Sequence, residues 1–288
     1  MKLFYYVHTG HRIGLDRFRR AATIIRALGD VDITLLTSDF RIASIAKEYG
    51  IKRAVGVDVV RNIPQIAHHG DKIIFDSAEA NPVLLEDMTR FFSTFVRVSD
   101  DPDDRKLPGE FLISPYLEGE GVCNALAIDP ACFDTEQKTI DRAFFFGDDD
   151  YGEDILANLE MFREHRLDLL LGFYWFIGYE EKIGGAFGRR YESEAYDEVV
   201  RQSRLLVTAS PQAALENLAA GGQPLYLQRP DYPRDFLPLF EKLQIPVVEG
   251  YDAALLSETL NNLPKYQTRT MANTTHKISE FLKTILDL

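Results

Sequence analysis

Short apolar runs alternate with amphipathic stretches along most of the chain. Residues 3–8 form a continuous apolar run typical of a buried strand, and residues 15–28 repeat apolar side chains at helical spacing until Gly29. The first half continues with predicted strands at 31–37, 53–57, 72–76, 94–99 and 111–114, and with predicted helices at 42–49, 63–69 and 82–92. Strands that alternate with helices of this length predict βαβ units and a parallel sheet, so the predicted fold class is α/β.

A second alternation follows a charged stretch at 100–108 and a turn-rich segment that reaches residue 141. It contains predicted strands at 142–146, 167–173, 204–208, 224–227 and 246–248, and predicted helices at 151–165, 195–203, 211–220, 236–243, 252–262 and 270–286. The pattern predicts two Rossmann-like domains, 1–138 and 139–269, followed by a C-terminal helix within 270–288. Their sheets are expected to leave a cleft at the carboxyl ends of the strands, where ligands of open α/β sheets bind.

Composition narrows the class of protein. The 288 residues are 45% hydrophobic and 27% charged, which is ordinary for a globular chain of about two domains. The formal charge of −13, with no basic block, argues against a nucleic-acid binder, because such proteins gain affinity by neutralising phosphates. It stays compatible with a small anionic ligand, since a helix N-terminus can hold a phosphate locally.

The sequence offers no sign of a membrane or secreted location. No apolar run reaches the length of about 18 residues that a membrane span needs, and the N-terminal segment is too short and polar for a signal peptide. Two cysteines, Cys123 and Cys132, do not suggest a disulfide framework. The expected location is cytoplasmic.

The first candidate loop runs from His8 to Gly14 and joins the first predicted strand to the first predicted helix. This is the usual position of phosphate approach in a doubly wound sheet. Gly10 and Gly14 permit tight turns, and His11 can act as general base or acid near neutral pH. The alternative is that both histidines are merely polar loop residues. Because no third ligand stands nearby, no metal site is predicted here.

The second candidate loop occupies the same position in the second half and carries Gly147 followed by Asp148, Asp149 and Asp150. A D-x-D pattern can bind a divalent metal that holds a diphosphate. Alternatively, Asp150 caps the helix that follows, where a carboxylate satisfies free N–H groups and suits the helix dipole. We favour the cap, and we predict neither a metal nor a cofactor.

The third candidate loop follows the strand that ends at Thr208. Ser210 is a good N-cap and Pro211 suits the first helical position, so a helix N-terminus is expected to point into the cleft, as a diphosphate requires. Glu216 lies less than two turns further on and can accept hydrogen bonds from two ribose hydroxyls; Gln212 lies on the same helix. The alternative is a solvent-facing glutamate on an amphipathic helix.

Together these residues resemble the GT-B family of nucleotide-sugar enzymes, most closely the UDP-sugar hydrolase of pseudaminic acid biosynthesis and its spore-coat polysaccharide relatives. Gly10 and His11 match the family's G-x-G-H-x-x-R loop, in which His8 replaces the first glycine and Gly14 the arginine. Thr208, Ser210 and Glu216 match its T/S-x-S/G…E helix, whose glutamate binds the ribose.

The middle of the chain also resembles this family. Asp76 and Asp100 stand at strand ends where the family has aspartates, and 146–150 echoes its F-G-G-S/T-D loop, with Asp148 in place of the second glycine. Relatives of this family end in a helix that crosses back onto the first domain, and the apolar side chains of 270–288 imply the same here.

The resemblance implies a nucleotide-sugar hydrolase, with UDP as the expected nucleotide, in surface or flagellar glycan biosynthesis. In that reading His11 activates the attacking water. The implied substrate-binding residues are Gly10, Arg12, Asp76 and Asp100. The implied nucleotide-binding residues are Gly147, Thr208, Ser210, Gln212 and Glu216. The implied partner is the small-molecule nucleotide sugar, with no nucleic acid.

Two alternatives stay open. A GT-B glycosyltransferase would use the same parts, with an acceptor hydroxyl in place of water. A catalytically degenerate sugar-nucleotide binder is also compatible with the departures at Gly14, Asp148 and Pro233.

Overall fold

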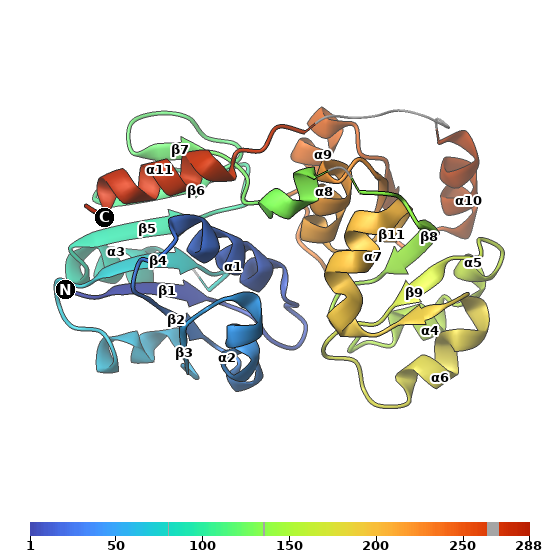
Figure 1. Cartoon of the computed structure of the whole chain (residues 1–288), viewed down its shortest axis with the longest axis horizontal. Helices are drawn as coiled ribbons and strands as arrows, with labels where there is room; N and C mark the ends of the chain where they lie inside the picture. The colour runs from blue at the N-terminus through green and yellow to red at the C-terminus, as the bar shows by residue number, and fades with distance from the viewer. Residues whose placement is uncertain (80, 135, 264–270) are drawn as a thin grey trace. The chain divides into compact units, whose positions relative to one another are not determined.

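The structure, a computed structural model, describes residues 1–79, 81–134, 136–263 and 271–288. It divides into two compact units (Figure 1): unit 1 consists of Met1–Ala127 and Thr274–Leu288, and unit 2 of Ile128–Asn273. The first division lies ahead of the boundary near residue 138 that the sequence predicts. The reason is that the short 3-10 helix Pro130–Phe133 packs on the helix Pro211–Ala219 of unit 2. The predicted boundary between residues 269 and 270 lies outside the described residues.

Unit 1 is built on a seven-stranded, wholly parallel sheet with the order β3-β2-β1-β4-β5-β6-β7. Its strands are β1 (Leu3–Val7), β2 (Ile33–Thr37), β3 (Arg53–Gly56), β4 (Lys72–Asp76), β5 (Thr94–Val98), β6 (Glu110–Ser114) and β7 (Val122–Asn124). Its helices are α1 (Asp16–Leu28), α2 (Phe40–Ile45), η1 (Ala46–Tyr49), η2 (Val60–Gln65), α3 (Pro82–Phe91) and α11 (Thr275–Ile285).

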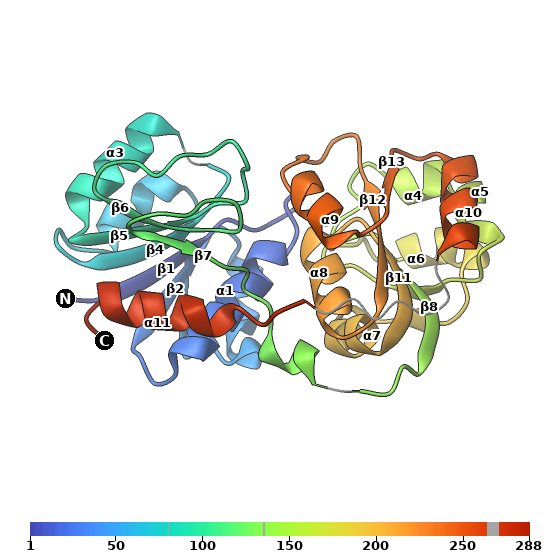
Figure 2. The same cartoon turned by 90° about the horizontal axis from the view of Figure 1, so that it is seen from above.

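Helices cover both faces of this sheet, which is why β1 and β4 are apolar runs without alternation. Figure 2 shows α3 on one side of the sheet and α1 with α11 on the other. The α3 side buries one set of strand residues against α3 and η2, namely Phe4, Tyr6, Ile73, Phe75 and Phe95. On the other side α11 packs along α1, where the Ser279 hydroxyl donates to the Ala27 carbonyl oxygen (2.8 Å).

Unit 2 has a six-stranded, wholly parallel sheet with the order β10-β9-β8-β11-β12-β13. Its strands are β8 (Ile140–Phe145), β9 (Asp168–Leu170), β10 (Arg190–Tyr191), β11 (Ser203–Thr208), β12 (Gln223–Gln228) and β13 (Val247–Glu249). Its helices are η3 (Pro130–Phe133), α4 (Asp154–Ala157), α5 (Glu160–Arg163), α6 (Tyr179–Ile183), η4 (Gly184–Ala186), η5 (Ser193–Ala195), α7 (Tyr196–Gln202), α8 (Pro211–Ala219), α9 (Leu237–Leu243) and α10 (Ala253–Asn262). One face buries residues of α4, α5, α6 and α10, and the other buries residues of α7 and α8.

Several predicted elements differ from the structure for local reasons. The predicted helix 151–165 is two short helices, because the Asn158 side-chain amide bonds the Asp154 carbonyl oxygen (2.8 Å) and competes with the helical ladder. The predicted helix 63–69 is the 3-10 helix η2, which contains Pro64, a residue with no N–H to donate. The predicted strand 167–173 shortens to β9, since the chain turns at Gly172, whose carbonyl accepts from the Trp175 N–H (3.2 Å).

Other differences lie at the ends of elements and in segments with weak patterns. The sequence pattern does not predict α6, η4, β10 or β7, which are each five residues or shorter. The predicted start of the last helix at Thr270 lies outside the described residues, and α11 begins at Thr275. Within the described parts of the chain, none of the helices combines the length and apolar character needed to cross a membrane.

Candidate functional site

Each sheet has a switch point where the strand order reverses, between β1 and β4 in unit 1 and between β8 and β11 in unit 2. Ligands of open α/β sheets bind at the carboxyl ends of the strands beside such a point. In unit 1 the His8 N–H donates to the Asp76 carbonyl oxygen (3.0 Å), and in unit 2 the Ala209 N–H donates to the Phe145 carbonyl oxygen (3.2 Å). All three predicted loops therefore lie at a switch point, one in unit 1 and two in unit 2.

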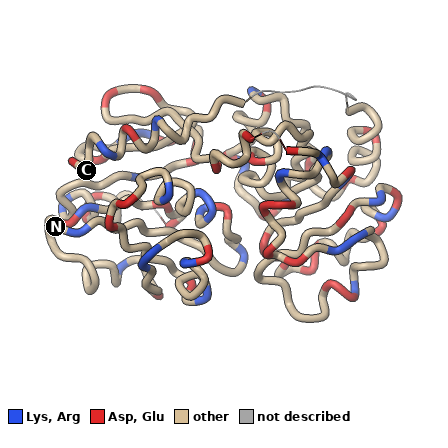
Figure 3. Tube along the Cα trace, in the orientation of Figure 1, with Lys and Arg blue, Asp and Glu red and all other residues tan. Residues whose placement is uncertain are grey.

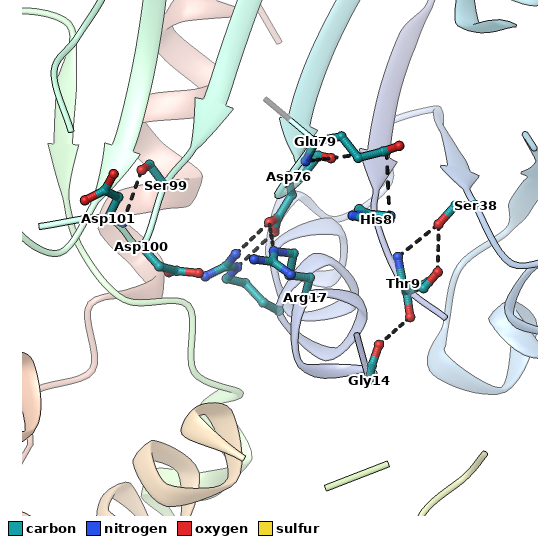
Figure 4. Close-up of polar contacts among 12 residues, drawn as sticks. His8, Thr9, Gly14, Arg17, Ser38, Asp76, Glu79, Ser99, Asp100 and Asp101 are labelled. Atoms are coloured by element: carbon teal, nitrogen blue, oxygen red, sulfur yellow. Dashed lines mark hydrogen bonds and ion pairs between the residues drawn. The ribbon is translucent and has the colours of Figure 1, made fainter. Parts of the chain in front are cut away.

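The loop after β1 is a tight turn held by its own backbone. The Gly14 N–H donates to the Gly10 carbonyl oxygen (2.9 Å), and Gly10 and Gly14 have φ angles of +150° and +79°, where a side chain would be strained. The Thr9 hydroxyl donates to the Gly14 carbonyl oxygen (2.6 Å), and Thr9 and the Ser38 hydroxyl exchange two more hydrogen bonds (3.0 and 2.7 Å; Figure 4). The predicted tight turn at these glycines is confirmed.

His11 and Arg12 occupy the part of this turn that faces solvent, and both side chains are exposed. Arg12 has a φ of +63°, an unusual value for a residue other than glycine. The turn thus presents an imidazole and a guanidinium on a fixed backbone. Their roles as catalytic base and substrate contact stay predictions.

Asp76, at the end of β4, is fully buried in an ion-pair network. Its two carboxylate oxygens accept from the Arg20 guanidinium (2.9 and 2.6 Å), and the Tyr5 hydroxyl donates to one of them (3.2 Å). The Arg17 guanidinium lies 3.6 Å from the other oxygen (Figure 4). These bonds tie α1 to the end of β4, so the geometry gives Asp76 a positioning role, whereas its predicted contact with a sugar stays a prediction.

Asp100 belongs to the same network. The Arg20 guanidinium donates to an Asp100 carboxylate oxygen (2.5 Å), so one buried cation bridges the ends of β4 and β5. Burial by itself would lower the pKa of Arg20, but the carboxylates of Asp100 and Asp76 outweigh this and raise the pKa well above its usual value. Arg20 therefore stays charged, and it holds both predicted substrate aspartates in place.

A histidine–carboxylate pair lies beside this network and was not predicted from the sequence. The His8 Nε2 atom lies 4.0 Å from the Glu79 Oε2 atom, and the two side chains are only 19% and 31% exposed. The Tyr6 hydroxyl donates to the same Glu79 oxygen (2.6 Å), which orients the carboxylate. Within the described part of the chain, the buried His8 Nδ1 atom has no hydrogen-bond partner.

The environment of His8 favours its neutral form. Burial lowers the pKa of the imidazole, the Glu79 carboxylate opposes that shift, and the Arg17 charge adds to it. A neutral imidazole can accept a proton, so His8 is a second candidate base beside His11. The sequence does contain a signal for Glu79: it stands three residues after Asp76, and the strand that ends at Asp76 is the one beside β1 in a Rossmann order.

The acidic loop after β8 caps a helix. The Asp150 carboxylate accepts from the N–H groups of Asp154 (2.8 Å) and Ile155 (3.1 Å), and the Tyr179 hydroxyl also donates to it. Burial raises the pKa of Asp150, although these three hydrogen bonds work in the opposite direction. The predicted capping role is confirmed by the two N–H contacts. Gly147 has a φ of +125°, a conformation that favours glycine.

Asp148 and Asp149 are both buried in this loop, and an arginine from the end of β12 lies against it. The Arg229 guanidinium donates to the Asp149 carbonyl oxygen (3.3 Å), stacks over the Phe146 ring at 4.5 Å and forms a bidentate pair with Asp231 (2.9 and 2.7 Å). In residues 1–79, 81–134, 136–263 and 271–288 no group of three or more His, Cys, Asp and Glu side chains is arranged to hold a metal ion.

The N-terminus of α8 is capped as predicted. Ser210 is the N-cap and its hydroxyl oxygen accepts from the Ala213 N–H (3.1 Å), Pro211 is the first helical residue, and the Thr208 hydroxyl oxygen accepts from the Ser210 N–H (3.0 Å). Thr208 and Ser210 are both buried at the end of β11.

Glu216 does not face solvent. The residue is only 4% exposed. Its carboxylate accepts hydrogen bonds from the Tyr196 hydroxyl (2.9 Å) and from the Gln212 side-chain amide (2.8 Å). This burial excludes the alternative of a solvated glutamate on an amphipathic helix. Two donors fix the direction of the carboxylate, and the ribose contact of Glu216 and Gln212 stays a prediction.

Comparison by sequence finds no relatives: no family model matches the chain, and no curated protein matches it. Comparison by structure finds solved proteins with a similar fold. A UDP-GlcNAc 2-epimerase of Methanocaldococcus jannaschii, in complex with UDP-GlcNAc and UDP, has a TM-score of 0.64 at 13% identity, with 100% of this chain and 99% of that chain covered.

Two further solved structures are similar over their full length. The S. aureus MnaA–UDP structure has a TM-score of 0.64 at 14% identity, covering 100% of this chain and 98% of that one. Anabaena Alr3699/HepE, in complex with UDP and glucose, has a TM-score of 0.59 at 11% identity, covering 100% and 96%. At such identities the likeness shows the fold alone, and it confirms the predicted α/β class and a GT-B fold with two parallel-sheet domains.

Proposed function

We propose that this chain binds a nucleotide sugar, with UDP as the nucleotide, and hydrolyses the bond between the sugar and the diphosphate. The observation that carries the proposal is the buried group of Thr208, Ser210 and Glu216 at the switch point of unit 2. The three solved structures of the same fold hold UDP, alone or with a sugar or UDP-sugar. That fold and these side chains together support a nucleoside diphosphate as the ligand of unit 2.

Unit 2 supplies the nucleotide contacts in this proposal. The N-terminus of α8 carries a partial positive charge that stabilises a diphosphate, most of all as it leaves with a growing negative charge. Glu216 accepts hydrogen bonds from the ribose hydroxyls, with its direction set by Tyr196 and Gln212. Gly147 allows the loop after β8 to approach the ligand without a side chain.

Unit 1 supplies the proton acceptor. His11 takes a proton from a water molecule, whose oxygen attacks the anomeric carbon of the sugar. The bond from that carbon to the diphosphate oxygen then breaks, and the electron pair leaves with the UDP. His11 suits this role because it lies exposed on a turn whose backbone is fixed by Thr9, Gly10 and Gly14.

Calorimetric titration with UDP tests the binding half of the proposal. Glu216→Gln keeps the size of the side chain but removes its charge, so UDP affinity should fall by about 5–100-fold, the scale of lost charge-assisted hydrogen bonds. The matched control is Glu258→Gln, an exposed glutamate of α10, which should bind UDP like the wild type. Equal affinity of both variants would remove Glu216 from the site, and the absence of UDP binding to the wild type would refute the proposal.

Product analysis tests the reaction. The enzyme is incubated with UDP-GlcNAc or UDP-glucose, and free sugar and UDP are followed by NMR with and without a sugar acceptor. Free sugar released without acceptor supports hydrolysis. UDP released only with acceptor would support a glycosyltransferase instead, and binding with no turnover under either condition would support a non-catalytic binder.

A further inference from the structure

A cavity of about 570 Å³ lies in unit 1 at the amino-terminal ends of the strands, opposite the carboxyl ends where the candidate residues lie. It is lined by the beginnings of β1 and β2, by β3 and by α2 and η1, and the residues just before β1 and β3 contribute to it. The candidate residues lie at the other ends of the strands: His8 follows β1, five residues after Leu3, and Asp76 is the last residue of β4, the strand beside β1. Because a strand rises about 3.3 Å per residue, the cavity and the candidate residues are separated by the length of β1.

The charge of this cavity is opposite to that of the chain. Four of its lining residues are cationic, and one is anionic; the cations are Lys2, Lys47, Lys52 and Arg53, and the anion is Asp32. The whole chain has a formal charge of −13, and Figure 3 shows acidic and basic residues interspersed along both units. A local excess of positive charge in an acidic protein attracts an anion and repels a cation.

Two of these cations are not neutralised by the protein. Arg53 pairs with Asp32, and Lys52 pairs with Asp30 (3.0 Å). Across the described ranges of the chain, neither Lys2 nor Lys47 has a side-chain ion pair. The backbone of Lys2 is fixed, since its N–H donates to an Asp71 carboxylate oxygen (2.7 Å) and its carbonyl accepts from the Lys72 N–H (2.9 Å).

The remaining lining is largely apolar. It includes Leu3, Phe4, Ala46 and Ile51, all buried, so the cavity combines an apolar floor with exposed cations at its rim. Its volume falls within the range of roughly 300–1,000 Å³ that is typical of small-molecule sites. Such a lining fits a ligand with an apolar body and a negatively charged group.

We propose that this cavity binds a small organic anion with an apolar body, at a site separate from the nucleotide site. The ammonium groups of Lys2 and Lys47 pair with the acidic group of the ligand, and the apolar floor receives its body. This inference goes beyond the proposed function and does not depend on it.

The dye 8-anilinonaphthalene-1-sulfonate is a suitable probe, because it combines aromatic rings with one sulfonate and fluoresces when its rings leave water. Titration of the folded full chain should show saturable binding to one site. Lys47→Glu should raise the dissociation constant of the dye by about tenfold or more, because it replaces an attraction of the sulfonate by a repulsion. Ser44→Trp, which places a large ring on the exposed α2 residue that lines the cavity, should weaken dye binding through steric exclusion.

Lys283→Glu is the matched control, since it reverses an exposed cation of α11 in the same unit, away from the cavity, and should leave dye binding unchanged. Circular dichroism establishes that each variant is folded. Addition of UDP should not displace the dye, because the two ligands are expected to occupy separate sites. The proposal is overturned if the wild type shows no saturable binding, if Lys47→Glu and Ser44→Trp bind the dye like the wild type, or if UDP displaces it.

Discussion

Replacing Asp76 by asparagine tests whether this buried carboxylate is part of the framework. The substitution keeps the volume of the side chain and removes the charge that two Arg20 nitrogens contact at 2.9 and 2.6 Å. Arg20 is itself buried, so it would be left with the partly buried Asp100 as its remaining anionic partner in the network. We therefore expect Asp76→Asn to destabilise unit 1.

The size of the effect follows from the burial of both partners. Removing one member of a buried ion pair costs about 3–5 kcal/mol, because it leaves an uncompensated charge away from water. Since Asp100 still pairs with Arg20, we expect the lower end, about 3 kcal/mol. For a unit of this size, that free energy corresponds to a fall in Tm of about 6–12 °C.

Urea and thermal unfolding followed by circular dichroism measure this change. Asp87→Asn is the matched control, since Asp87 is an exposed aspartate of α3 in the same unit, and it should change the free energy of unfolding by less than about 0.5 kcal/mol. The double variant Arg20→Met/Asp76→Asn should be less destabilised than the sum of the two single variants, because it leaves no lone buried charge.

A loss in Asp76→Asn no larger than that of the Asp87→Asn control would refute the framework role. It would show that Arg20 does not depend on this carboxylate, and it would return Asp76 to the list of groups available to a substrate.

Three further predictions concern catalysis, pH and metal. His11→Asn should lower the rate of UDP-sugar hydrolysis by about 10²–10⁴-fold with little change in UDP affinity, whereas His276→Asn, an exposed histidine of α11, should leave the rate unchanged. If His8→Gln abolishes turnover and His11→Asn does not, the base is His8. Because the pKa of His8 is lowered in the folded state, its imidazole is protonated in the unfolded chain at a higher pH than in the folded chain. The free energy of unfolding should therefore decrease as the pH falls below about 6.5. Urea midpoints between pH 7.5 and 5 should therefore depend less on pH in His8→Gln than in the wild type, and equal slopes would contradict this origin. EDTA should leave the calorimetric affinity for UDP unchanged, because Asp150 serves as a helix cap, and a chelator-sensitive affinity would reverse that assignment.

The sequence by itself determined the features that depend on neighbouring residues. Apolar runs such as β1 predict strands buried on both faces, and their alternation with helices predicts the parallel sheets. The N-cap at Ser210 and the capping carboxylate of Asp150 were also predictable, because a cap acts on N–H groups only a few residues away. Helical periodicity overestimated two helices, one where the Asn158 side chain competes for a helical carbonyl oxygen and one where Pro64 has no N–H to donate.

Only the tertiary structure decided which distant side chains meet. Arg20 reaches Asp76 and His8 lies beside Glu79 because the sheet order places β4 next to β1, across more than fifty residues of chain. The amphipathic pattern of the last helix indicates that Ile278 and Leu282 are buried. It does not indicate that α11 packs against α1. Strand order and helix docking depend on the total apolar area that whole faces bury, and a short stretch of sequence does not contain this information. The framework role of Asp76 and the His8–Glu79 pair therefore became visible only in the folded chain.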